Sequence, residues 1–172
     1  MTDTSAKNRA IFFDRDGVLN VDTGYLFRIE DFEWISGAPE AVAWAAGKGY
    51  QTIVVTNQSG IARGYYTEDS MNCLHRWMNE DLQRRTGCSI DAFYHSPFHP
   101  DANIPVYKHA DHPDRKPNPG MVLRAIQDFS LSPEACLMIG DKQSDMEAAR
   151  RSNVPSHLFQ GGNLLQALQS AL

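Results

Sequence analysis

Short apolar runs alternate with helical patterns along this sequence, and that rhythm limits the possible folds more than any other feature. Residues 9–13 form an apolar run that stops at Asp14, and residues 51–56 form a second run rich in β-branched side chains. Residues 90–94 and 135–139 continue the series, and a last strand and helix follow near the C-terminus. Strands that alternate with helices predict a parallel sheet with right-handed crossovers.

The helices carry their own start signals. Residues 38–48 and 67–86 are predicted helices, and Thr67 is suited to cap the second one. Two shorter helices follow, one that Asn118 is expected to cap and one over residues 144–152. One face of the long helix is apolar and is predicted to lie in the core: Met71, Leu74, Met78 and Leu82.

Length and composition indicate one soluble domain over residues 1–172, with residues 1–8 flexible. Hydrophobic residues make up 42% of the chain, and no apolar run approaches the roughly 20 residues that span a membrane. Three widely spaced cysteines suggest no disulfide framework, and a formal charge of −5 argues against a general nucleic-acid binder. We therefore expect a monomeric cytoplasmic protein with no nucleic-acid or membrane partner.

Polar residues follow several of the predicted strands at the point where each strand ends. Asp14 and Asp16 follow the first strand, Thr56 ends the second and Asp141 follows the fourth. Lys116 stands just before the helix that leads into the fourth strand. Ligands of parallel sheets collect beyond the carboxyl ends of the strands, so these four segments are expected to meet at one site.

Three of these residues are carboxylates without a cysteine among them, which favours a hard cation such as Mg²⁺. Gly17 permits the turn that would bring Asp14 and Asp16 to one centre, where Asp141 would join them. The alternatives are an Asx-turn that merely ends the first strand and, for Asp141 and Asp145, helix capping.

Residues 56–60 (Thr-Asn-Gln-Ser-Gly) supply hydroxyl, amide and main-chain donors that suit phosphoryl oxygens. Lys116 could neutralise a transferring phosphoryl group. The alternatives are a structural turn at the start of a helix and an ordinary solvated lysine.

Taken in order, these motifs resemble those of the haloacid-dehalogenase (HAD) superfamily of phosphotransferases. The matching positions are residues 14–17, Thr56, Lys116 and residues 140–141, and the resemblance extends from about Arg9 to the C-terminus. It implies a Rossmann-like three-layer α/β/α sandwich with a mostly parallel sheet. It also implies Mg²⁺-dependent phosphoryl transfer.

The resemblance implies a role for each motif residue. Asp14 would be the nucleophile and would form an aspartyl-phosphate. Asp16 would act first as acid and then as base, while Thr56 and Lys116 would stabilise the phosphoryl oxygens. The implied Mg²⁺ ligands are Asp14, Asp141 and the main-chain carbonyl of Asp16, with Asp145 in support.

The spacing of the motifs leaves no room for a folded cap domain. Residues 14–56 can hold a flap and one helix, and residues 56–116 one long helix, one strand and a loop. We therefore expect a capless enzyme, with residues 95–117 forming a substrate-site loop.

Within the superfamily, residues 14–25, 56–64, 115–121 and 140–142 resemble a branch of heptose 1,7-bisphosphate phosphatases. The branch removes the 7-phosphate of D-glycero-D-manno-heptose 1,7-bisphosphate, a step toward nucleotide-heptose for lipopolysaccharide or another surface glycan. Arg115 suits a distal phosphate because its guanidinium can bind one bidentately. The substrate contacts implied are Asp22, Thr23, Gly24, Tyr25, Asn57, Gln58, Ser59, Arg63, Arg115 and Lys142.

Two other functions remain open from the sequence. Histidinol-phosphate phosphatases share the aspartate motif, although they usually have Asn-Gln-Asp-Gly where this chain has Asn-Gln-Ser-Gly at residues 57–60. A non-catalytic phospho-ligand-binding module is less favoured, because Asp14, Asp16 and Asp141 are all present.

The resemblance fails at one place. Relatives usually carry a structural zinc loop of four ligands that include cysteines, and the matching positions here are Ser96, Phe98, His112 and Asp114. Without thiolates we expect no zinc. A histidine-based site is the alternative, since four histidines crowd the loop: His95, His99, His109 and His112.

Overall fold

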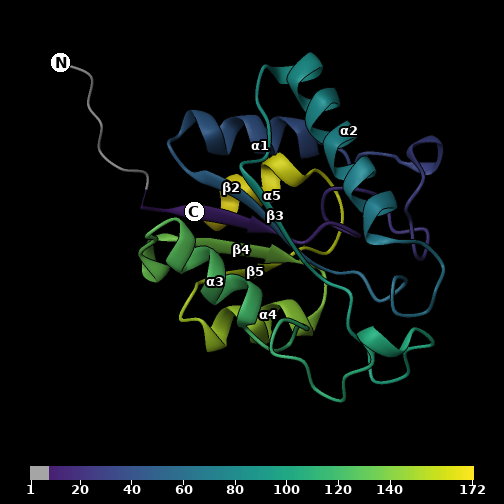
Figure 1. Ribbon diagram of the computed structural model, residues 1–172. Helices are drawn as coiled ribbons and strands as arrows, with labels where there is room; N and C mark the ends of the chain where they lie inside the picture. The colour runs from purple at the N-terminus through teal and green to yellow at the C-terminus, as the bar shows by residue number, and fades with distance from the viewer. Residues whose placement is uncertain (1–7) are drawn as a thin grey trace.

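The computed structural model of this chain describes residues 8–172 (Figure 1). The prediction that residues 1–8 are flexible falls mostly on residues 1–7, which lie outside the described residues. The carbonyl of Asn8 accepts a hydrogen bond from the main-chain N–H of Ser132, at 2.7 Å.

A five-stranded parallel sheet forms the centre of the fold, as the alternation of strands and helices predicts. Its order is β3-β2-β1-β4-β5. Phe13, the last residue of β1, pairs with Val54 of β2 and with Ile139 of β4, so the residues that follow these strands meet at one edge. The strands are β1 (Ala10–Phe13), β2 (Gln51–Asn57), β3 (Ala92–Ser96), β4 (Leu137–Gly140) and β5 (Ser156–Leu158).

Helices cover both faces of the sheet and complete the expected three-layer α/β/α sandwich (Figure 1). One face carries α1 (Ala38–Gly47), α2 (Glu68–Thr86) and α5 (Leu164–Ala171). The other face carries α3 (Gly120–Asp128) and α4 (Gln143–Arg151). Three single 3₁₀ turns lie in the loops, at Ile29–Asp31, Pro105–Tyr107 and Pro133–Ala135.

The core lies in two layers, one on each face of the sheet. Ile11 and Phe13 of β1 point into the layer under α1, α2 and α5, whereas Phe12 points into the layer under α3 and α4. The predicted apolar face of α2 is confirmed, because its four members are fully buried: Met71, Leu74, Met78 and Leu82.

Several predicted boundaries move by one or two residues. Strand β3 begins at Ala92 rather than residue 90, and β4 begins at Leu137 because a 3₁₀ turn occupies the three residues before Cys136. The prediction that Asn118 caps α3 is wrong, since the helix begins at Gly120 with Pro119 as its N-cap. The Asn118 side chain instead donates to the Asp111 carboxylate at 2.7 Å and to the His112 carbonyl at 3.0 Å.

The connections before and after β2 contain no separate folded unit within residues 8–172, in agreement with a capless fold. No described helix has the length and the apolar character that crossing a membrane requires. The three cysteines are free.

Candidate active site

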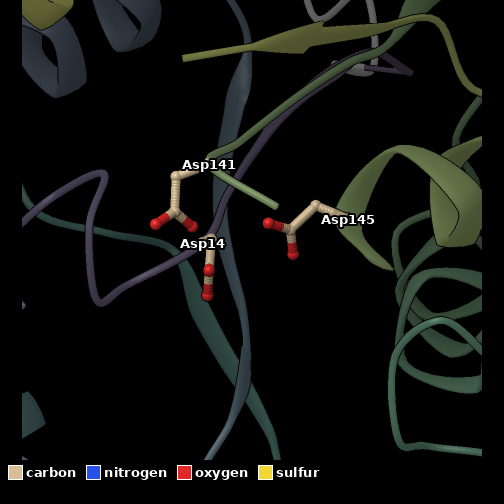
Figure 2. Close-up of side chains that lie close together, drawn as sticks. All are labelled: Asp14, Asp141 and Asp145. Carbon is tan, nitrogen blue, oxygen red and sulfur yellow. The ribbon is translucent and has the colours of Figure 1, made fainter. Parts of the chain in front are cut away.

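Three carboxylates converge where β1 and β4 end and α4 begins. Asp14 follows β1, Asp141 follows β4, and Asp145 lies in the first turn of α4. In Figure 2 the carboxylates of Asp141 and Asp145 point toward Asp14, and one oxygen of each of the three side chains lies within 4.8 Å of the other two. The main chain fixes Asp14 beside β4, because its N–H donates to the Ile139 carbonyl at 3.0 Å.

The charges of this carboxylate cluster are only partly balanced by the protein. Burial raises the pKa of Asp14 to about 7; Lys116 opposes this shift, while Asp145, Asp16 and Asp141 add to it. Burial also raises the pKa of Asp141, against the effect of Lys142. Such a cluster is stabilised by a cation among the carboxylates.

Two further observations fit a divalent cation at this centre. The Oδ1 atom of Asp141 is buried and has no hydrogen-bond partner. Gly17 adopts φ +86°, and a Cβ atom there would overlap the Asp141 carboxylate. The space beside Asp141 therefore depends on a glycine at position 17, and oxygen ligands alone match the preference of Mg²⁺.

Lys116 places a buried positive charge against this carboxylate cluster. Its side chain is buried, and Nζ lies 2.6 Å from Asp145 Oδ1, 3.1 Å from Asp14 Oδ1 and 2.8 Å from the Val55 carbonyl. Burial alone would lower the pKa of Lys116, but the two carboxylates outweigh it and raise the pKa. Asn57 holds the main chain at this point: its amide donates to the Lys116 carbonyl and accepts from the Lys116 N–H, both at 3.0 Å.

Both carboxylate oxygens of Asp145 have partners within the protein. Oδ1 accepts from Lys116, and Oδ2 accepts from the main-chain N–H of Lys142 at 3.1 Å, which caps α4. This arrangement agrees with a supporting role for Asp145 rather than direct coordination.

Asp16 faces hydrogen-bond donors from three side chains. Arg15 Nη2 lies 3.0 Å from Oδ1, Asn20 Nδ2 donates to Oδ1 at 3.0 Å, and Gln58 Nε2 donates to Oδ2 at 3.0 Å. These three hydrogen bonds fix the orientation of the Asp16 carboxylate.

Gln58 also connects Asp16 to the end of β2. Its Nε2 donates to Thr56 Oγ1 at 2.9 Å, and Tyr66 donates its hydroxyl to the Gln58 carbonyl oxygen. The Tyr66 ring stacks on Phe27, with ring centres 5.1 Å apart, so the amide orientation is fixed from both sides.

A cavity of about 560 Å³ opens over this centre. It reaches Asp14, Asp16 and Lys116, and Tyr66 forms part of its wall. Thr56 and Asp141 do not line the cavity, and Thr23 lines a neighbouring groove instead. Eight of the predicted substrate-binding residues line it: Asp22, Gly24, Tyr25, Asn57, Gln58, Ser59, Arg115 and Lys142.

A second positive region lies at the side of this cavity. Burial and the nearby Arg63 lower the pKa of Arg115, and burial together with both guanidinium groups lowers the pKa of His99. Arg63 is not among the residues that line the cavity, but it lies 3.4 Å from His99 Nε2 and 5.8 Å from the centre of the Tyr25 ring. Among the described residues, neither arginine has a carboxylate within 4.0 Å. The two guanidinium groups therefore offer charge to an anion.

The structure also brings in residues that the sequence analysis did not select. Arg15 and Asn20 contact Asp16, Tyr66 holds Gln58, and His75 contacts Arg15 from α2. Arg15 and Asn20 are polar residues next to the aspartate motif, and this position in the sequence could have identified them as part of the site. His75 and Tyr66 gave none, because their approach depends on how α2 and its preceding loop pack.

The histidines of the 95–117 loop make contacts that need no metal. Phe98 stacks on His112, with ring centres 3.6 Å apart, and His95 pairs with Glu68 at 3.2 Å. In the part of the chain that the structure describes, the one group of three potential metal-ligating side chains is the aspartate cluster. The absence of zinc stays a prediction. Three imidazoles accept through Nδ1 a main-chain N–H from two residues later: His99, His109 and His112.

Comparison with known proteins identifies the group in which this site occurs. A family model described as HAD-hydrolase-like matches residues 114–170. A D-glycero-alpha-D-manno-heptose-1,7-bisphosphate 7-phosphatase of Burkholderia mallei is 47% identical over 153 residues, which cover 89% of this chain and 80% of that protein. A D-glycero-beta-D-manno-heptose-1,7-bisphosphate 7-phosphatase of Pasteurella multocida is 42% identical, over 85% of this chain and 78% of that protein.

A solved structure with the same fold contains the cation that the motifs of this chain imply. The D,D-heptose 1,7-bisphosphate phosphatase of B. bronchiseptica, complexed with magnesium and phosphate, matches with a TM-score of 0.78 at 28% identity. The match covers 94% of this chain and 86% of that chain. The resemblance inferred from the motifs is confirmed: this chain is a phosphoric monoester hydrolase that belongs to the HAD-like hydrolase family, together with relatives named heptose-1,7-bisphosphate 7-phosphatases.

Proposed function

We propose that this enzyme removes the 7-phosphate of D-glycero-D-manno-heptose 1,7-bisphosphate, with Mg²⁺ held by Asp14, Asp141 and the main-chain carbonyl of Asp16. The observation that carries the proposal is one cavity of about 560 Å³ that joins the carboxylate cluster to Arg115. A sugar with two phosphates needs two anion-binding regions in one pocket. The same function is in the names of the relatives from Burkholderia mallei and Pasteurella multocida.

The first half of the reaction uses Asp14 as the nucleophile. A carboxylate oxygen of Asp14 attacks the 7-phosphorus, the bond from phosphorus to the C7 oxygen breaks, and that oxygen takes a proton from Asp16. Bound Mg²⁺ would offset the negative charge of the attacking carboxylate and the phosphoryl group. Lys116, 3.1 Å from Asp14 Oδ1, stabilises the charge on the phosphoryl oxygens together with Thr56.

The second half regenerates the carboxylate. A water oxygen attacks the phosphorus of the aspartyl-phosphate and gives a proton to Asp16, and phosphate leaves as Asp14 recovers its carboxylate. The hydrogen bonds from Arg15, Asn20 and Gln58 support this role, because they hold the Asp16 carboxylate in one orientation.

Arg115, supported by Arg63, binds the 1-phosphate in this proposal. Its planar guanidinium can hold a phosphate bidentately, and no carboxylate of the described chain competes for it within 4.0 Å. The same cavity is lined by Asp22, Gly24, Tyr25 and Lys142, and the sugar would contact these residues.

Phosphate release from a panel of esters, in the presence of Mg²⁺, tests the proposal. The panel contains both anomers of the heptose bisphosphate, histidinol phosphate, fructose 1,6-bisphosphate and simple monoesters. A clear preference for one heptose anomer is expected and assigns the enzyme to nucleotide-heptose synthesis for a surface glycan. A preference for histidinol phosphate, or equal weak turnover of all esters, would refute the assignment of the sugar.

We further propose that the enzyme works as a monomer in the cytoplasm, without nucleic-acid or membrane partners. The formal charge of −5 and the absence of a membrane-spanning helix in the described residues support this proposal. Light scattering coupled to size-exclusion chromatography measures the mass, which a monomer would give as 19.3 kDa.

A further inference from the structure

A fully buried guanidinium lies directly behind the proposed acid/base. The Arg15 side chain has 0% exposure, although it carries a charge that is costly to remove from water. Its one carboxylate partner within 4.0 Å, among the described residues, is Asp16. Buried ion pairs are weak contributors to stability, because desolvation offsets their attraction. The pair therefore calls for an explanation other than stability.

The Arg15 guanidinium makes hydrogen-bond contacts with three residues from different parts of the fold. Nε and Nη2 contact Asp16 Oδ1 at 3.3 and 3.0 Å, and Nη2 also donates to the Leu26 carbonyl at 2.7 Å. Nη1 lies 3.3 Å from His75 Nε2. Because a guanidinium has only donors, His75 Nε2 is the acceptor in this contact.

His75 is itself rigidly placed. It is buried within α2, and its ring stacks on Phe93 of β3 with ring centres 4.3 Å apart and an angle of 14° between the planes. A chain of contacts therefore runs from β3 through His75 and Arg15 to the Asp16 carboxylate.

We propose that Arg15 and His75 are positioning residues that hold the Asp16 carboxylate in the orientation required for proton transfer. The inference rests on the proposed role of Asp16 as acid and base. Neither residue touches substrate in this arrangement, and both act through Asp16. A proton donor must be aligned within hydrogen-bond distance of the leaving oxygen, so a carboxylate that rotates freely transfers its proton less often.

A pair of substitutions at His75 separates positioning from packing. His75→Phe keeps an aromatic ring against Phe93 but removes the acceptor for Arg15, whereas His75→Gln keeps an acceptor near the position of Nε2. Both variants are compared with wild type using two esters, phenyl phosphate and p-nitrophenyl phosphate. Phenolate is the poorer leaving group and needs a proton from Asp16, while p-nitrophenolate leaves without one.

The expected result is selective for the leaving group. His75→Phe should lower kcat/KM for phenyl phosphate about 10-fold and change kcat/KM for p-nitrophenyl phosphate less than about twofold. The 10-fold loss is a fraction of the roughly 10²–10⁴-fold that general acid catalysis contributes. His75→Gln should restore the wild-type ratio of the two esters. In an Asp16→Asn background, His75→Phe should cause no additional loss, because it acts through the same carboxylate.

A loss that is equal for both esters would show that His75 serves the fold alone and would overturn the inference. If His75→Phe fails to fold, Arg15→Lys provides the second test, since lysine keeps the charge but loses the fork that contacts Asp16, and the same ester selectivity is expected. Wild-type enzyme that releases phosphate from neither the heptose bisphosphate nor the two aryl esters would refute the proposed function together with this inference. Hydrolysis by wild type with unchanged ratios in every variant would refute only the inference.

Discussion

Replacing Asp14 by asparagine should abolish turnover and, at the same time, stabilise the metal-free protein. The free carboxyl titrates near 3.8 and the buried one near 7, so the folded chain binds more protons than the unfolded chain between these pH values. The contribution of Asp14 to the free energy of unfolding of wild type therefore falls as the pH rises from about 4 to about 7 and is constant above. At 1.36 kcal/mol per pKa unit, this fall amounts to about 4 kcal/mol.

The Asp14→Asn variant has no carboxyl group to ionise at this position, so its free energy of unfolding should not show this fall with pH. In metal-free buffer at pH 8 the variant should be more stable than wild type by up to about 4 kcal/mol, a rise in Tm of roughly 8–16 °C for a domain of this size. The two proteins should converge near pH 4, where the carboxyl of wild type is protonated. Asparagine keeps the oxygen that accepts the Arg15 N–H at 2.8 Å, so little other structure is disturbed.

Thermal unfolding with EDTA at pH 4, 6 and 8 measures these differences, and repeating the series with Mg²⁺ adds a second check. Mg²⁺ should raise the Tm of wild type more than that of the variant, because the variant lacks one ligand. Asp145→Asn is the matched control, and it should lower stability since it breaks the 2.6 Å ion pair with Lys116. A variant at position 14 that is no more stable than wild type at pH 8 would contradict the reasoning from burial and charge.

The remaining predictions concern Lys116, Gly17 and zinc. Lys116→Met leaves two buried carboxylates without their cation. It should therefore reduce kcat by at least about 100-fold and lower the free energy of unfolding by about 3–5 kcal/mol. Steady-state kinetics and denaturant unfolding measure the two effects. Gly17→Ala places a Cβ atom against the Asp141 carboxylate at a residue with φ +86°. It should weaken Mg²⁺ binding at least about 10-fold and lower the free energy of unfolding by about 1–3 kcal/mol. Titration of activity and of Tm with Mg²⁺ measures both effects. Protein purified without chelator should contain far less than one zinc per chain by elemental analysis, and a ratio near one would revive a histidine site in the 95–117 loop.

The sequence by itself determined the fold class and the chemical centre. Hydrophobic periodicity and composition are enough to predict strands that alternate with helices, because a buried strand and an amphipathic helix each have a recognisable local sequence pattern. Asp14, Thr56 and Asp141 could be placed at one edge without coordinates, since the ends of parallel strands in one sheet necessarily lie together. Helix ends were less certain, and Asn118 proved to be a loop residue because α3 begins two residues later.

The tertiary structure alone decided how those residues are supported. The pairing of Lys116 with both Asp14 and Asp145 and the contact of His75 with Arg15 join residues far apart in the chain. The hydrogen bond of Tyr66 to Gln58 depends on how the loop between β2 and α2 folds. No local pattern encodes such contacts, because they depend on where α2 and its preceding loop pack against the sheet. The chain's own periodicity thus places the aspartates at the edge, while long-range packing sets their charges and orientations.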